Sequence, residues 1–284
     1  MTVLNDSEAF YDKERLLPQH QTALALIQNV VENPQLDTYS WLDLCCGRGQ
    51  IITHLESMID ERSRSKINYF AYDVKSDFAS LTQRKAETLG LNNVRVEVGD
   101  IANFTAIYTN DFRADFITLT NTVHEINVHI LSKLYIETIL RLNESGCLFI
   151  YDMEHLPKLE LGAITWSATE MQRIIITLIN SLGVTDYAPK VSRVPHKSTF
   201  CWSIQLRREY FRKSREEILE KSEEASRSTQ ELINRLILEK YESCKGVLES
   251  LTKYGSDNKQ EESELQSLLY DFWALSRALG VITC

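Results

Sequence analysis

A short glycine-rich stretch has the clearest chemical potential in the sequence. Residues 41–49 read WLDLCCGRG: an apolar run that predicts a buried strand, then a turn with two glycines, then a helix. Glycine adopts backbone angles that other residues disfavour, and it lets a ligand lie directly against the main chain. In doubly wound α/β folds, ligands bind at the carboxyl ends of the strands. The stretch therefore predicts a ligand-binding turn.

The spacing of these glycines differs from that of a dinucleotide site. A dinucleotide fingerprint has a third glycine three residues after the second, and that position is Ile52. Asp43 stands at the end of the predicted strand. A carboxylate there suits a positively charged amino group better than a pyrophosphate. Both residues argue against an NAD-dependent oxidoreductase.

The segment Asp43-Leu-Cys-Cys-Gly-Arg-Gly49 resembles motif I of the class I S-adenosyl-L-methionine (SAM) methyltransferases, with Cys45 at a commonly glycine position. The resemblance covers about residues 20–206. It implies that Asp43 contacts the SAM amino group, directly or through water, and that Asp73 binds the ribose hydroxyls. It also implies that Asp100 contacts the adenine and that Ile101 packs on the ring. The implied cofactor-binding residues are Asp43, Cys45, Gly47, Gly49, Asp73, Val74, Asp100, Ile101 and Asn121.

The segment Asn121-Thr-Val-His-Glu-Ile126 follows the fourth predicted strand. It is similar to the N-x-x-H-x-I stretch of many small-molecule and ubiquinone-biosynthesis-type methyltransferases. The similarity puts His124 and Glu125 near the transferred methyl, as candidate catalytic residues. His124 could act as a general base; alternatively, both residues only line the pocket. Methyl transfer is an in-line displacement at an activated carbon, so positioning alone can supply most of the acceleration.

Polar residues after the fifth predicted strand, Asp152, Glu154 and His155, could line the acceptor pocket. A metal site made of Glu125, His129, Glu154 and His155 would be similar to that of RNA 3′-end methyltransferases. Their clustered E-x-x-E-H pattern is absent, so we expect no metal. The Asn/Asp-Pro-Pro-Tyr motif of many amino-methylating DNA enzymes is also absent after the fourth predicted strand.

Composition and charge narrow the class of protein. The chain has 284 residues, and 31 Lys+Arg against 40 Asp+Glu give a formal charge of −9, which weighs against a dedicated nucleic-acid binder. The longest apolar runs have five residues, whereas a membrane span needs about 20. No signal peptide is visible. Six cysteines without metal-binding spacing predict reduced thiols in a cytoplasmic protein.

The distribution of proline divides the chain, because all five prolines lie before residue 196. Before that point, strand-like and helix-like patterns alternate, which predicts βαβ units. The predicted strands span 41–45, 68–74, 94–98, 115–120, 147–152, 185–187 and 199–206. The predicted helices span about 19–32, 51–62, 78–89, 128–142 and 168–182. No helix is predicted between the last two strands, so these should form an antiparallel pair at the sheet edge.

Beyond residue 206 the pattern is helical. Phe211, Ile218, Ala225 and Leu232 are spaced by seven, a turn is expected at 255–260, and a second amphipathic helix at 264–279. The simplest interpretation of a local basic cluster at 207–215 is a solvated helix face. The predicted fold is α/β, a doubly wound, mostly parallel seven-stranded Rossmann-like methyltransferase sheet with a C-terminal helical extension. The predicted domains are a methyltransferase domain at 1–206 and a helical hairpin at 207–284.

The predicted function is transfer of a methyl group from SAM to an O, N or C acceptor, leaving S-adenosyl-L-homocysteine. A small-molecule acceptor is favoured, and nucleic acid and membrane partners are disfavoured. Two alternatives stay open: a non-catalytic SAM-fold partner or regulatory subunit that acts through its helical tail, and a protein or RNA methyltransferase. The final helix is apolar enough to need a partner surface, either within the chain or in another copy or protein.

Overall fold

One mixed sheet forms the centre of the molecule. The computed structural model describes residues 16–156, 158–196, 199–254 and 259–281. The strands in this part are β1 (Tyr39–Leu44), β2 (Ile67–Asp73), β3 (Asn92–Val98), β4 (Ala114–Thr120), β5 (Leu142–Met153), β6 (Val191–His196) and β7 (Thr199–Arg207). Their order is β3-β2-β1-β4-β5-β7-β6. The first five pair in parallel, and β7 and β6 add antiparallel at one edge. The predicted seven-stranded fold with its antiparallel edge pair is confirmed.

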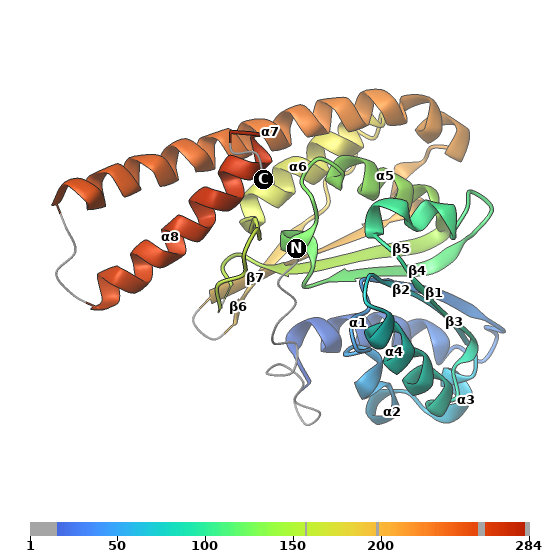
Figure 1. The fold of residues 1–284 in the computed structure, drawn as a ribbon. Helices are drawn as coiled ribbons and strands as arrows, with labels where there is room; N and C mark the ends of the chain where they lie inside the picture. The colour runs from blue at the N-terminus through green and yellow to red at the C-terminus, as the bar shows by residue number, and fades with distance from the viewer. Residues whose placement is uncertain (1–15, 157, 197–198, 255–258, 282–284) are drawn as a thin grey trace.

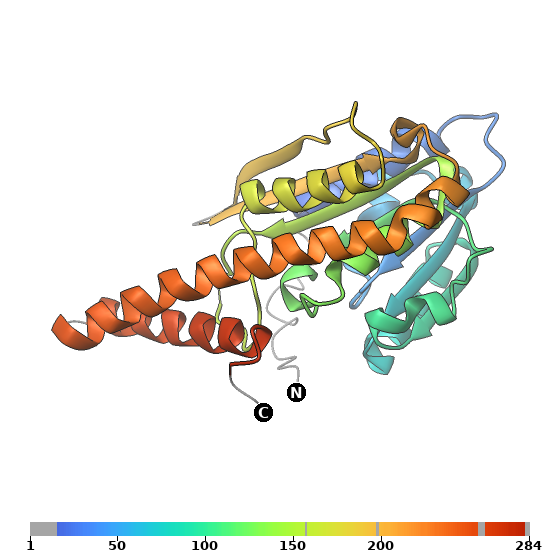
Figure 2. The same ribbon diagram turned by 90° about the horizontal axis from the view of Figure 1, so that it is seen from above.

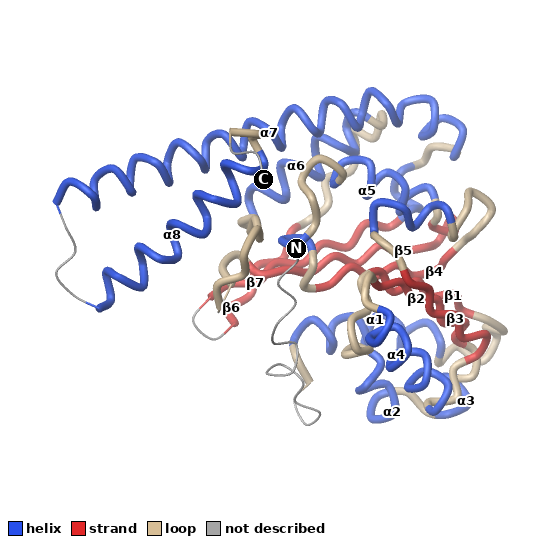
Figure 3. Tube along the Cα trace, viewed as in Figure 1, coloured by secondary structure: helices blue, strands red, loops and turns tan. Residues whose placement is uncertain are grey.

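Helices cover both faces of this sheet (Figure 1). The described α-helices are α1 (Pro18–Val31), α2 (Leu55–Met58), α3 (Glu61–Arg64), α4 (Ser76–Thr88), α5 (Leu131–Leu140), α6 (Ala168–Ser181), α7 (Arg215–Tyr254) and α8 (Lys259–Ala278). α1 to α4 lie on one face, and α5 and α6 lie on the other (Figures 1 and 2). α7 crosses the outer side of α5 and α6, and α8 returns along α7 (Figure 3). None of the described helices is long and apolar enough to span a membrane.

Alternate residues of the strands supply two separate hydrophobic clusters. On β1, Trp41 packs on the face covered by α1, whereas Leu42 and Leu44 pack on the face covered by α5 and α6. On β4, Phe116 and Ile117 divide in the same way. This two-residue period places the side chains of each strand on opposite faces, and both faces of a parallel sheet are buried.

Two predicted elements differ from the structure. The predicted helix 51–62 is broken into a 3-10 turn, α2 and α3, because Ile59 is extended and Asp60 begins a new helix by accepting the Ser63 N–H. The predicted strand 185–187 is wrong. The edge strand is β6, after Pro189, because its register with β7 pairs Val191 with Ile204 and His196 with Thr199. Of the expected turn at 255–260, residues 255–258 lie outside the described part.

The seven-residue stripe of the tail is a packing surface. Phe211, Ile218, Ala225 and Leu232 are each 8% exposed or less, and they join the same hydrophobic cluster as α5 and α6. The pattern therefore fits α7 against the α/β body. How far residues 207–284 form a domain of their own stays a prediction.

A buried polar network lies at the centre of the sheet. The Asp43 side chain is 2% exposed. Its carboxylate accepts hydrogen bonds from the hydroxyls of Thr118 (2.7 Å) and Tyr69 (3.0 Å), and Thr118 accepts one from the Trp41 indole (2.8 Å). Burial raises the pKa of Asp43 to about 6, against the opposing effect of the two hydroxyls. The network joins β2, β1 and β4 directly beneath their carboxyl ends.

Truncation of a buried leucine in α7 tests the packing of the tail. Leu236 is 1% exposed and Leu238 is 48% exposed on the same helix. We expect Leu236→Ala to lower the free energy of unfolding by about 2–5 kcal/mol, because it removes core contacts and leaves a cavity. The matched control Leu238→Ala should change it by less than about 1 kcal/mol. Urea denaturation of both variants measures the difference, and equal effects would contradict the packing of α7 on the body.

The raised pKa of Asp43 predicts a pH-dependent stability. A folded-state pKa of about 6 lies above the ordinary 3.8, so the folded protein binds the proton more tightly. The resulting stabilisation is complete below about pH 4 and is lost as the pH rises through 6, by up to about 3 kcal/mol. The unfolding free energy of the wild type, minus that of Asp43→Asn, should therefore fall between pH 4 and 7. A flat curve would refute the assignment.

Candidate active site

The carboxyl edge of the sheet gathers most of the residues that the sequence singled out. β1 leads into the turn 45–49, β2 ends at Asp73, β3 is followed by Gly99 and Asp100, and β4 is followed by Asn121–Glu125. β1 lies between β2 and β4, and the order of the strands reverses there. Such a switch point opens a crevice outside the carboxyl ends of the strands.

The turn after β1 has a left-handed backbone at three positions. The φ angles are 57° at Cys45, 55° at Gly47 and 70° at Gly49. Glycine takes these angles at little cost, whereas Cys45 is a non-glycine residue in a sparsely populated region. Strain of this kind persists where the surrounding structure imposes it, often at ligand sites. Burial raises the pKa of the Cys45 and Cys46 thiols, so neither is a thiolate at neutral pH.

Asp73 holds this turn in place. Its side chain is 7% exposed, and its carboxylate accepts hydrogen bonds from the N–H of Gly47 (2.8 Å) and the N–H of Lys75 (2.9 Å). Burial raises the pKa of Asp73, while these two donors oppose the rise. The Gly47 carbonyl also accepts a hydrogen bond from the Thr82 hydroxyl of α4 (2.9 Å). The carboxylate therefore fixes the glycine turn to the end of the neighbouring strand.

Apolar side chains are exposed beside Asp73. Val74 is 58% exposed and Val98 is 48% exposed, at the carboxyl ends of β2 and β3. Asp100 follows, and its carboxylate caps the short 3-10 helix Ile101–Ala106 through the Ala102 N–H (2.9 Å). The rim thus offers an apolar surface next to carboxylates, as a ligand with a flat base and a sugar requires.

Asn121 stands at the switch point itself. Its φ angle is 55°, and its N–H donates to the Tyr151 carbonyl of β5 (2.8 Å). The side-chain oxygen is buried and has no hydrogen-bond partner among the described residues. A buried acceptor without a donor costs free energy, so the position suits the donor of a bound ligand.

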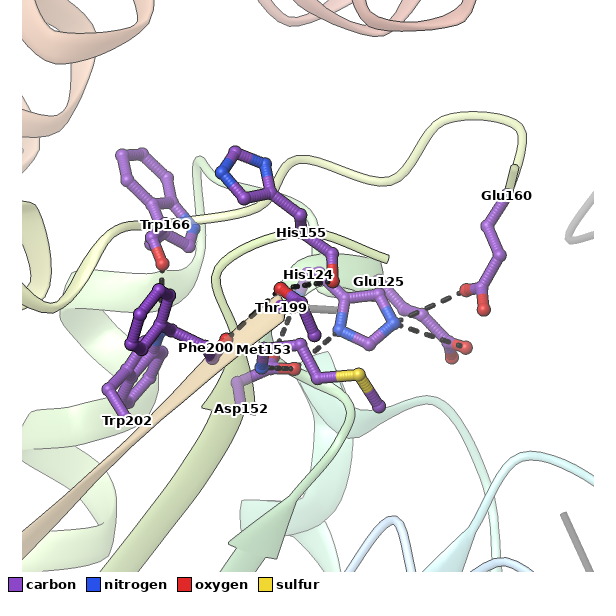
Figure 4. A network of polar contacts seen from close by, with 10 residues as sticks. All are labelled: His124, Glu125, Asp152, Met153, His155, Glu160, Trp166, Thr199, Phe200 and Trp202. Carbon is purple, nitrogen blue, oxygen red and sulfur yellow. Dashed lines mark hydrogen bonds and ion pairs between the residues drawn. The ribbon is translucent and has the colours of Figure 1, made fainter. Parts of the chain in front are cut away.

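His124 is the centre of a second polar network (Figure 4). Buried Asp152, at the end of β5, accepts hydrogen bonds from His124 Nδ1 (2.7 Å) and from the His124 N–H (2.9 Å). On the other side of the ring, Nε2 lies 3.2 Å from a Glu160 oxygen and 3.9 Å from a Glu125 oxygen. The structure therefore places Glu160 beside the two candidate residues His124 and Glu125.

Charge around this network shifts two pKa values. Burial lowers the pKa of His124, but Asp152 and Glu160 outweigh it and raise the pKa well above 6.5. Glu125 is 41% exposed at the rim. Desolvation by the surrounding protein raises its pKa to about 7; His124 opposes the rise, and Glu160 adds to it.

Two expectations from the sequence change in the structure. The Asp43 carboxylate lies beneath the turn, where Thr118 and Tyr69 occupy it, so it is not presented at the surface of the crevice. Glu154 forms a two-pronged ion pair with Arg193 (2.9 and 2.8 Å) and accepts the Ala168 N–H (2.9 Å), which anchors α6 to the sheet edge.

The four-residue metal set considered from the sequence is not brought together. His129 is 3.0 Å from the Ala278 carbonyl of α8, and Glu154 is paired with Arg193. Among the described residues, the group of ligand atoms close enough to hold an ion is instead His124, Glu125 and Glu160. The sequence carried no signal for Glu160, because it lies in an irregular loop 36 residues after His124.

The basic cluster at 207–215 is largely engaged within the protein. Arg208 is 1% exposed and donates to the Lys213 carbonyl. Arg215 donates to the Leu142 carbonyl (2.7 Å), and Arg212 pairs with Asp186 (3.2 Å). These contacts therefore hold in place the segment of chain that leads into α7.

Comparison with known proteins identifies the family of the chain. Residues 36–197, more than half of the chain, match a family described as "Methyltransferase domain". No curated protein matches the chain. Solved structures with a similar fold include the magnesium protoporphyrin IX methyltransferase (ChlM) of Synechocystis PCC 6803 with bound SAM. It is 13% identical, with 66% of this chain and 79% of that chain covered, at a TM-score of 0.44.

Two further structures show comparable overlap. A SAM-dependent methyltransferase from Aquifex aeolicus is 18% identical, with 65% of this chain and 97% of that chain covered and a TM-score of 0.38. TehB from Haemophilus influenzae is 13% identical, with 70% of this chain and 65% of that chain covered and a TM-score of 0.45. Family membership rests on the matched residues 36–197 and not on these overlaps. The chain belongs to the methyltransferase-domain family, whose methyl donor is SAM, which confirms the enzyme class and cofactor that the resemblance to motif I implied.

Proposed function

We propose that the protein binds SAM along the carboxyl ends of β1 to β4, transfers its methyl group to a small-molecule acceptor, and releases S-adenosyl-L-homocysteine. The observation that carries this proposal is the placement of Asp73. Its carboxylate ends β2 beside the left-handed glycine turn and is already fixed by two backbone N–H groups. A carboxylate held in this way can accept hydrogen bonds from both ribose hydroxyls without reorganising.

The adenine would lie over the exposed apolar rim. Val74 and Val98 are about half exposed, and a flat base resting on them would remove apolar surface from water. Asp100 and Ile101 follow β3 on the same side and are the proposed partners of the adenine edge and face. This arrangement gives the exposed valines a function that folding alone does not.

The methionine part of SAM would lie along the turn itself. Gly47 and Gly49 expose the main chain there, Cys45 adjoins them, and the unpartnered oxygen of Asn121 is a ready acceptor for the amino group. Asp43 would act on that group through its negative charge, because its carboxylate is buried beneath the turn. At neutral pH, a buried carboxylate so close to the site favours a positively charged ligand.

On the acceptor side we propose His124 and Glu125. They follow Asn121 on the connection after β4 and face the loop that carries Glu160 (Figure 4). The donor carbon of SAM is already activated, so the residues on this side act mainly by holding the acceptor in line with it. A small molecule is favoured because the chain is acidic and its basic cluster is engaged in internal contacts.

The proposal also includes the cellular location and the domain organisation of the protein. The described cysteines, Cys45, Cys46, Cys147, Cys201 and Cys244, are free thiols, as expected in a reducing compartment, so we infer a cytoplasmic location. We also retain residues 1–206 as the catalytic domain and residues 207–284 as its helical extension.

Removal of the Asp73 carboxylate tests the cofactor site. We expect Asp73→Ala to weaken SAM binding by on the order of 1.5–3 kcal/mol, about 10- to 150-fold, because it deletes two charge-assisted hydrogen bonds. Calorimetric titration with SAM and then with S-adenosyl-L-homocysteine measures the loss. Exposed Asp77 on α4 provides a matched control, and Asp77→Ala should bind like the wild type.

The same titration decides between the alternatives. Unchanged affinity in folded Asp73→Ala would remove the ribose assignment. If the folded wild type binds neither compound, the glycine turn is structural and the chain is a scaffold. If the wild type binds NAD instead, the result would favour the hypothesis of an NAD-dependent oxidoreductase.

The class of acceptor has its own test. With methyl-labelled SAM and a cell extract divided by size, we expect the label to move to the low-molecular-mass fraction, because the chain is acidic and Arg208 and Arg215 of its basic cluster make internal contacts. Label in protein or RNA, abolished by nuclease or protease treatment, would identify a macromolecular acceptor. Asp73→Ala is the control, and it should transfer little label to any fraction.

A further inference from the structure

Three ligand-type side chains converge on one point at the acceptor side of the crevice. His124 and Glu125 lie on the short 3-10 helix Val123–Glu125, and Glu160 lies on the loop between β5 and α6. One ligand atom from each lies within 4.8 Å of the other two. Their convergence from two separate connections is a product of the fold (Figure 4).

The spacings match those of ligands around a single ion. Nitrogen and oxygen ligands lie about 2.0–2.2 Å from a first-row divalent metal, so two neighbouring ligands are roughly 3.0–3.5 Å apart. His124 Nε2 is 3.2 Å from the Glu160 oxygen. The Glu125 oxygen is 3.9 Å away, and this side chain, 41% exposed, has room to close the difference.

The histidine is oriented as metal-binding histidines are. A carboxylate accepts hydrogen bonds, so Nδ1 of His124 carries the proton that Asp152 accepts at 2.7 Å. The other oxygen of Asp152 accepts the His124 N–H, which fixes the main chain as well. Asp152 is 1% exposed, so this support is rigid. Nε2 is thereby directed at the two glutamates, in the carboxylate–histidine arrangement that supports metal sites.

The negative charges around His124 also favour a bound cation. Three carboxylates, those of Asp152, Glu125 and Glu160, surround one imidazole. A single proton on Nε2 leaves two of the three negative charges uncompensated there, whereas a divalent ion in its place leaves one. His124 and Asp152 are buried, and like charges that converge at such short range are costly without compensation.

We propose that His124, Glu125 and Glu160 bind a divalent first-row metal ion, with Asp152 as the positioning residue of His124. One imidazole and two carboxylates suit Mn²⁺, Fe²⁺ or Zn²⁺. This differs from the expectation of no metal drawn from the sequence, which had no means to find Glu160. Three protein ligands leave coordination positions open, so an oxygen of the acceptor can occupy one.

The metal would then act on the acceptor. A hydroxyl of the acceptor coordinated to the ion would lose its proton to solvent water more readily, and the resulting oxygen anion would bond to the methyl carbon of SAM as the carbon–sulfur bond breaks and S-adenosyl-L-homocysteine leaves. This role rests on the proposed function, because it places the acceptor oxygen beside the SAM methyl. It favours acceptors with a metal-binding hydroxyl, and His124 and Glu125 act through the ion instead of taking the proton themselves.

Titration of the full-length protein with Mn²⁺ tests the site, with the loss of the free-ion electron paramagnetic resonance signal as the measure. We expect micromolar binding by the wild type and about tenfold or more weaker binding by Glu160→Gln and by Glu125→Gln. Glu97→Gln is the matched control, since Glu97 is 30% exposed and pairs with Arg95 on β3. It should bind Mn²⁺ like the wild type.

Calorimetric titration of the same preparations with SAM separates this proposal from the previous one. Mn²⁺ binding without SAM binding would leave the metal site standing and remove the proposed function. SAM binding without Mn²⁺ or Zn²⁺ binding up to about millimolar concentration would overturn the metal site. Equal Mn²⁺ binding by the wild type and both glutamine variants would overturn it as well, since the ion would then lie elsewhere.

Discussion

The parallel pairing of β1 with both β2 and β4 is the constraint on which the site depends. Parallel strands bring their carboxyl ends to one edge, and the reversal of strand order at β1 opens a crevice there. The glycine turn, Asp73 and the segment from Asn121 to Glu125 come from three different strands, and only this pairing makes them neighbours. The hydrogen bonds of Asp43 with Tyr69 and Thr118 join the same three strands one layer below. The pairing of β1 with β2 and β4 thus determines both the position of the crevice and the stability of the sheet centre.

Much of the fold could be predicted because its signals are local. Alternation of strand and helix patterns predicts the sheet, and a residue at the end of a strand, such as Asp73, falls at the carboxyl edge by construction. Asp43 shows the limit of this reasoning. Both faces of a parallel strand are buried, so the apolar pattern does not say toward which face a side chain points. The packing of Trp41 decides this, and it carries Asp43 into the layer beneath the turn. Glu160 shows a second limit, because a residue in an irregular loop, 36 positions after its partner His124, leaves no periodic trace.

The helical tail is tied to the acceptor side as well as to the core. Its buried stripe on α7 lies on α5 and α6, and Lys240 adds an ion pair to Glu170 at the start of α6 (2.9 Å). At its far end, the Ala278 carbonyl accepts a hydrogen bond from His129, and Trp273 lies against Gly162. His129 follows the segment with Glu125, and Gly162 follows Glu160. The last helix therefore supports both connections that carry the glutamates, which gives the extension a structural link to the site.

Asp152 explains why those glutamates meet an imidazole at all. A buried carboxylate needs hydrogen-bond donors, and His124 supplies two of them, one from the main chain and one from Nδ1. That demand fixes the ring, so Nε2 has only one direction in which to face, toward Glu160 and Glu125. The excess of negative charge at that point is then a consequence of stabilising Asp152, and a positive group must balance it. A proton balances part of the charge and a divalent ion balances more, so the geometry that satisfies one buried acid also prepares the place where an acceptor oxygen would be held.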